Sequence, residues 1–196
     1  MKKSESTIKP ARLEAFSDGV IAIIITIMVL EIRAPKGHEL SDWINTIPII
    51  LAYLFSFVFL AIYWNNHHHL LRATKHITPG VMWSNMSLLF FLSLIPVATA
   101  WIGEDKNYLE SWPIALYAVI SMLAGVSFFA LTQSILKADP GNIQVAELKQ
   151  SKKSRIGPVI YIIAFGVAFV SPVVALLIMV ANAAIWFIPD KRLTNY

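Results

Sequence analysis

The chain has 196 residues, of which 57% are hydrophobic and only 14% are charged. Soluble domains carry about 25% charged residues, so this composition indicates a membrane protein and argues against a soluble enzyme or binding domain. The net charge of +4 comes from basic residues scattered through short connections, which does not favour a nucleic-acid-binding surface, and the absence of cysteine excludes disulfides and thiolate metal ligands.

The first apolar segment is predicted to span the membrane over about residues 16–34 and to end at Pro35. It begins late and lacks a small-residue cleavage site, which favours a retained span over a cleaved signal peptide. Asp18 lies near its start and Glu31 near its end. A helix rises ~1.5 Å per residue against a hydrocarbon core of ~30 Å, so Asp18 is expected at or inside the membrane edge. An acid there is unfavourable without a partner, so we interpret Asp18 as structural or functional.

Five further membrane spans are predicted along the chain. Pro96 is expected to kink the third span, and a basic, polar stretch over 144–155 is predicted to be amphipathic. Ser171-Pro172 divides the last apolar stretch into two short spans, with one tilted helix as the alternative. The polar connections are too short to bury a core, so residues 1–196 are predicted to form one six-span domain. The predicted spans after the first cover residues 47–64, 81–102, 112–136, 157–170 and 172–188.

The distribution of basic residues predicts the orientation of these spans. With six spans, both termini lie on one side, and that side holds all of the 16 lysines and arginines except Arg33, Lys36 and Lys106. Because basic residues concentrate on the cytoplasmic side, both termini are predicted to be cytoplasmic. The asymmetry also favours an even number of spans.

One stripe of the first span has an aliphatic character. On a helical wheel Ile23, Ile27 and Leu30 fall within about 60° of one another, and Thr26 lies at the edge of that stripe. Every face of this helix is apolar, so periodicity alone favours a lipid-facing or packing stripe over a pore lining.

Four motifs give the chain a family resemblance. Arg12-x-x-x-Phe16-Ser17-Asp18 precedes an apolar helix that closes in Leu30-Glu31. It is followed by Trp64-x-x-His67-His68, Trp83-x-Asn85 and Leu88-Leu89-Phe90-Phe91-x-x-Leu94-Ile95-Pro96. With these motifs the whole chain resembles the transmembrane protein 175 family, the potassium channels of endolysosomes and bacteria. Having one six-helix repeat, it resembles the bacterial form, which implies a multi-pass protein of the bacterial plasma membrane.

The resemblance implies a homotetramer in which the first helix of each subunit lines a central pore. It assigns the principal constriction to Ile23, further apolar layers to Ile27 and Leu30, and a selectivity-associated hydroxyl to Thr26. A ring of aliphatic side chains blocks ions by dewetting. The sequence lacks the Thr-Val-Gly-Tyr-Gly filter of ordinary potassium channels, so only modest discrimination of potassium from sodium is expected.

Asp18 lies about 140° from Ile23 on the wheel, so it is expected to point into the protomer. A hydrogen-bonded network that braces the first helix is favoured over a proton relay, with Ser17, Trp83 and Asn85 as expected partners. The family motif implies the same bracing role. The predicted network comprises Arg12, Phe16, Ser17, Asp18, Trp64, His67, His68, Trp83 and Asn85.

The histidine run invites two hypotheses. One of His67 or His68 is expected to reach the Asp18 network, which would make gating depend on pH. A metal site is not expected, because the three consecutive histidines His67, His68 and His69 point about 100° apart on a helix.

Taken together, the sequence predicts an all-α integral membrane channel that is not an enzyme and needs no cofactor, with potassium as its permeant ion. Its expected partners are the lipid bilayer and three further copies of itself, and no nucleic acid. The first alternative is a proton- or cation-coupled transporter that uses Asp18, although such transporters usually show broken helices and internal repeats. The second is a membrane scaffold without transport.

Overall fold

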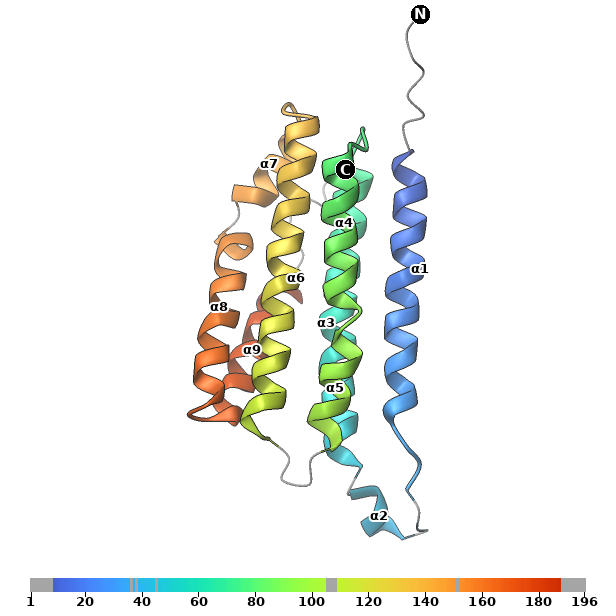
Figure 1. Cartoon of the computed structure of the whole chain (residues 1–196), viewed down its shortest axis with the longest axis vertical. Helices are drawn as coiled ribbons and strands as arrows, with labels where there is room; N and C mark the ends of the chain where they lie inside the picture. Colours follow the sequence, from blue (N-terminus) through green and yellow to red (C-terminus); the bar gives the residue numbers. More distant parts are fainter. Residues whose placement is uncertain are drawn as a thin grey trace, which may run out of the picture.

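The structure is a computed structural model that describes residues 9–35, 37, 39–44, 46–104, 109–150 and 152–187. Within this part of the chain the regular secondary structure is entirely helical (Figure 1). The helices are α1 (Pro10–Met28), the 3-10 turn η1 (Val29–Glu31), α2 (Leu40–Ile44), α3 (Ile47–Arg72), α4 (Pro79–Leu92), α5 (Ile95–Glu104), α6 (Ser111–Ala138), α7 (Ile143–Gln150), α8 (Lys152–Ala168) and α9 (Pro172–Phe187).

Helix α1 lies at one edge of the bundle (Figure 1). It begins six residues earlier than the predicted span, because Pro10 occupies a first-turn position where its missing N–H is not needed. It ends in η1, and Ile32 is already extended, so the predicted end at residue 34 is three residues too late. The buried side chains recur every three or four residues, which defines a single packed face: Leu13, Ser17, Ile21, Ile24 and Met28.

Two predicted spans differ from the helices that the chain forms. Helix α3 continues to Arg72, so Trp64 and the histidines lie inside it and not at its end. Trp64 Nε1 and His67 Nε2 have hydrogen-bond partners on neighbouring helices. The predicted third span is two helices, α4 and α5, separated at Ser93 and Leu94. Pro96 lies in the first turn of α5, so the predicted kink takes the form of a two-residue interruption in the apolar stretch Pro79–Gly103.

Helix α6 occupies the middle of the bundle and packs against α4 and α8 (Figure 1). Two serine pairs join α4 to α6: Ser84 Oγ lies 3.0 Å from Ser134 Oγ, and Ser87 Oγ lies 3.0 Å from Ser127 Oγ. Hydroxyl pairs of this kind hold helices together in an apolar environment.

A buried polar cluster joins four of the helices. Ser56 of α3 and Thr99 of α5 share a hydrogen bond of 2.7 Å, and the Tyr117 hydroxyl of α6 donates to Ser56 over 3.1 Å. The Thr99 hydroxyl also lies 3.9 Å from the Met28 sulfur of α1. Helix α1, which was predicted to line the pore, thus contacts a buried cluster of hydrogen-bonded hydroxyl groups.

In the described part of the chain, four helical stretches are long and apolar enough to cross a membrane: Pro10–Glu31, Ile47–Arg72, Pro79–Gly103 and Ser111–Ala138. The helices after α7 carry shorter apolar stretches, Ile156–Ala168 and Pro172–Trp186. The two are separated at Phe169–Ser171, next to Pro172. Helix α7 lies at one end of the bundle and α2 at the other (Figure 1).

Candidate functional site

The candidate site is the surface of α1 that the rest of the protomer leaves uncovered. Ile23, Ile27 and Leu30 are 59%, 43% and 75% exposed, whereas Ile21 and Ile24 on the packed face are buried. The same stripe extends toward the start of the helix through Phe16, which is 51% exposed. A monomer in water would not leave such a stripe open, so it faces lipid, a pore or another subunit.

Thr26 lies on this exposed side of α1. Its hydroxyl is 3.0 Å from the carbonyl oxygens of both Ala22 and Ile23, so its hydrogen is directed back onto the helix. The side chain therefore presents its oxygen to the exposed stripe as an acceptor, which is the polarity that a cation requires.

A chain of hydrogen bonds links the packed face of α1 to α3 and α4. Asn85 of α4 donates from Nδ2 to Ser17 Oγ over 2.9 Å, and its Oδ1 lies 2.7 Å from His67 Nε2 of α3. Ser17 in turn donates to the Leu13 carbonyl oxygen over 2.9 Å. Ser17, His67 and Asn85 are all fully buried, so this chain fixes the position of α1 against both helices.

Asp18 bonds Trp64, a member of the predicted network, and not Ser17, Trp83 or Asn85, which were its expected direct partners. Trp64 Nε1 of α3 donates to Asp18 Oδ1 over 3.0 Å, while Ser17 and Asn85 bond to each other and Trp83 is 69% exposed. The reason is helical geometry: Ser17 and Asp18 point about 100° apart, so one faces α4 and the other faces α3. Asp18 is partly buried and points toward α3.

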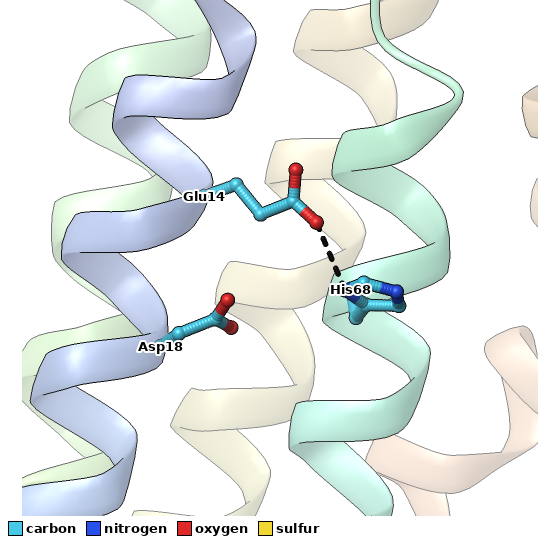
Figure 2. Close-up of side chains that lie close together, drawn as sticks. All are labelled: Glu14, Asp18 and His68. Carbon is cyan, nitrogen blue, oxygen red and sulfur yellow. Dashed lines mark ion pairs between the residues drawn. The ribbon is translucent and has the colours of Figure 1, made fainter.

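The two histidines have separate neighbours. His67 joins the Ser17–Asn85 chain, whereas His68 lies beside Glu14 and Asp18 of α1 (Figure 2). His68 Nδ1 is 2.9 Å from Glu14 Oε1, which is an ion-pair distance. His69 packs edge-on against His68, with ring centroids 5.6 Å apart.

Some predicted network residues are not brought together. Arg12, Phe16 and Trp83 lie on the protomer surface, and within the described residues Arg12 makes no ion pair. Glu14, in contrast, was not singled out from the sequence. Its spacing of four residues from Asp18 places both carboxylates on one face of a helix, and this was the signal that could have found it.

Comparisons with known proteins place this architecture among characterised channels. A family profile described as "Endosomal/lysosomal potassium channel TMEM175" matches residues 12–96. A potassium channel from Chryseobacterium sp. (strain P1-3) is 42% identical over 183 residues, which cover 93% of this chain and 94% of that relative. A potassium channel from Chamaesiphon minutus is 31% identical over 172 residues, covering 82% and 84% of the two chains.

A solved structure is similar over nearly the whole bundle. It is the crystal structure of a lysosomal potassium-selective channel TMEM175 homolog from Chamaesiphon minutus, with a TM-score of 0.76 and 28% sequence identity. The similarity covers 91% of this chain and 96% of that one.

Proposed function

The chain belongs to the TMEM175 family, and on this premise we propose that it is a potassium-permeable channel with its constriction on α1. Four copies surround a central pore, each contributing the exposed stripe of Ile23, Ile27 and Leu30. The observation that carries this proposal is that stripe: it is uncovered in the protomer, while the opposite face of α1 is buried.

The proposed gate works by excluding water. A ring of four Ile23 side chains is apolar and narrow, so the pore dewets there, and a small rotation or dilation of α1 restores conduction. Sodium holds its hydration shell more tightly than potassium, so dehydration at the ring favours potassium. The Thr26 oxygens offset part of that dehydration, which gives modest selectivity without a carbonyl filter.

We further propose that six apolar stretches cross the bilayer, with α4 and α5 together forming one of them and α8 and α9 forming short spans, and that both termini lie in the cytoplasm of a bacterial cell. The connections 73–78 and 139–142 follow α3 and α6 at the end of the bundle where α1 begins. Lys75 lies in the first of these connections, and Lys137 lies in the last turn of α6 just before the second, as basic residues do at the cytoplasmic ends of spans.

The coupled-transporter alternative is not favoured. Helix α1 is unbroken from Pro10 to Met28, and Asp18 faces α3 away from the exposed stripe. A coupling site at the midplane would call for a discontinuous helix.

Potassium-driven flux into liposomes that contain the purified protein tests the proposal. We expect the wild type to carry potassium faster than sodium. Ile23→Asn should raise the flux severalfold and reduce the preference for potassium, because a polar ring stays wet. Ile162→Asn is the matched control. Ile162 lies on α8 and is 55% exposed, against 59% for Ile23, and its substitution should leave flux unchanged.

Two outcomes would count against the proposal. Absence of flux under any gradient would reject the channel. Equal flux in the wild type and Ile23→Asn would retain the channel but move the constriction to another residue.

A further inference from the structure

Glu14, Asp18 and His68 form a compact cluster between α1 and α3 (Figure 2). One potential ligand atom from each lies within 4.8 Å of those of the other two. All three side chains are partly buried; those of Glu14 and His68 are 20% and 29% exposed. The cluster is separate from the exposed stripe of α1.

The cluster carries an excess of negative charge and an unused ligand atom. Glu14 and Asp18 lie one turn apart, and within the described part of the chain no lysine or arginine forms an ion pair with either. His68 Nδ1 is buried and 2.9 Å from Glu14 Oε1, yet it makes no hydrogen bond in this geometry. Two carboxylates and an imidazole nitrogen that face one another attract a divalent cation, whose two positive charges offset the negative charge of both carboxylates.

Trp64 supports two members of the cluster at once. Its Nε1 donates to Asp18 Oδ1 over 3.0 Å, and its indole stacks on the His68 ring with centroids 5.8 Å apart and an interplanar angle of 25°. Hydrogen bonds and packing of this kind orient the ligands of metal sites. Within the described residues no hydrogen bond reaches Asp18 Oδ2, so this oxygen can serve as a ligand.

We propose that Glu14, Asp18 and His68 bind a divalent transition-metal ion of the zinc type and thereby tie α1 to α3. Imidazole combined with carboxylates suits such ions, and magnesium disfavours the nitrogen ligand. With zinc bonds of about 2.0–2.2 Å, tetrahedral ligand atoms lie roughly 3.3 Å apart. Small side-chain rotations bring the cluster to that spacing, and water completes the coordination.

This site differs from the histidine run considered from the sequence. Only His68 of the three consecutive histidines takes part, and the other two ligands come from α1. The site does not depend on ion conduction, so its test uses binding alone.

Calorimetric titration of zinc into the metal-free, solubilised full chain tests the proposal. We expect one zinc ion per chain, with no binding of magnesium at the same concentrations. Glu14→Gln and His68→Ala should each weaken zinc binding about tenfold or more. Cobalt(II) supplies a spectroscopic check, because it absorbs visible light strongly when it is bound in a tetrahedral site. These absorption bands should appear with the wild type and be absent from both variants.

Glu110→Gln and His76→Ala are the matched controls, because each changes the same residue type at an exposed position outside the cluster. Both should bind zinc as the wild type does. Zinc binding that is unchanged in Glu14→Gln, or equally weakened in the controls, would overturn the proposal. If the His68→Ala variant does not fold, zinc binding by the Glu14→Gln variant, which changes a partly exposed side chain, tests the proposal by itself.

Discussion

Asn85 is the residue that connects the first helix of the bundle to two others. It bonds Ser17 of α1 and His67 of α3 in a fully buried position; Ser17 also donates to the Leu13 carbonyl oxygen, whereas His67 Nε2 bonds Asn85. Buried networks of this kind specify one arrangement of helices when complete and destabilise the fold when one member is lost.

Removal of the Asn85 amide should therefore destabilise the protein. Asn85→Ala leaves Ser17 and His67 without this partner, and we expect the free energy of unfolding to fall by about 1–3 kcal/mol. Thermal unfolding in detergent measures the change. Asn65→Ala on α3 is the control: within the described residues Asn65 makes no side-chain hydrogen bond, so its effect should stay within about 0.5 kcal/mol. Equal losses in the two variants would contradict the bracing role of Asn85.

The sequence motifs identified most of the residues that form hydrogen bonds around α1, but they did not predict which residue bonds to which. Ser17, His67 and Asn85 are brought together, whereas Trp83 and Arg12 stay at the surface. Which of two adjacent residues faces which neighbour depends on where the neighbouring helices lie. That information comes from packing, and the sequence of α1 alone does not contain it.

At the scale of elements, the close approach of α5 to α3 rests on Gly103. A Cβ built at this position would lie 2.8 Å from Ile49 Cβ and 2.8 Å from Ile49 Cγ1. The position of Ile49 Cβ is fixed by the α3 backbone, so no side-chain rotation moves this atom away. The missing side chain of Gly103 is thus what lets the two helices meet.

We expect Gly103→Ala to push α5 from α3 and to reduce the free energy of unfolding by about 1–3 kcal/mol. Gly166→Ala on α8 is the matched control, because nothing lies within 4 Å of an added Cβ there. That change should be neutral or should stabilise the helix by up to about 1 kcal/mol. Melting temperatures of the two variants in detergent separate these outcomes, and a Gly103→Ala protein as stable as the wild type would refute the contact.

The apolar runs of the sequence predicted which segments form helices, but they predicted the ends of these helices less accurately. The polar Trp64-to-His69 segment suggested the end of a span, but α3 continues through it to Arg72, and neighbouring helices supply hydrogen-bond partners to Trp64 and His67. Pro96 suggested a kink inside one helix, and the helical stretch is interrupted for two residues, Ser93 and Leu94, before α5 begins. The end of α3 was misplaced because local composition does not report hydrogen bonds between helices.

At the scale of the whole molecule, the bundle leaves α1 at its edge with one aliphatic face uncovered (Figure 1). The sequence predicted that stripe from its spacing, but an isolated periodicity does not say whether it meets lipid or a pore. Family membership and the similar channel structure support the pore, and the central claim is that Ile23 lines it.

Thiol accessibility tests that claim most directly, because the chain contains no cysteine and one introduced thiol is unique. Silver ions are close to potassium in size and react with thiols, so they reach a residue that lines a potassium pathway. We predict that silver blocks potassium flux through Ile23→Cys but not through the wild type or through Ile162→Cys, whose side chain is equally exposed on α8. Unblocked flux in Ile23→Cys, or block in Ile162→Cys alone, would contradict the account.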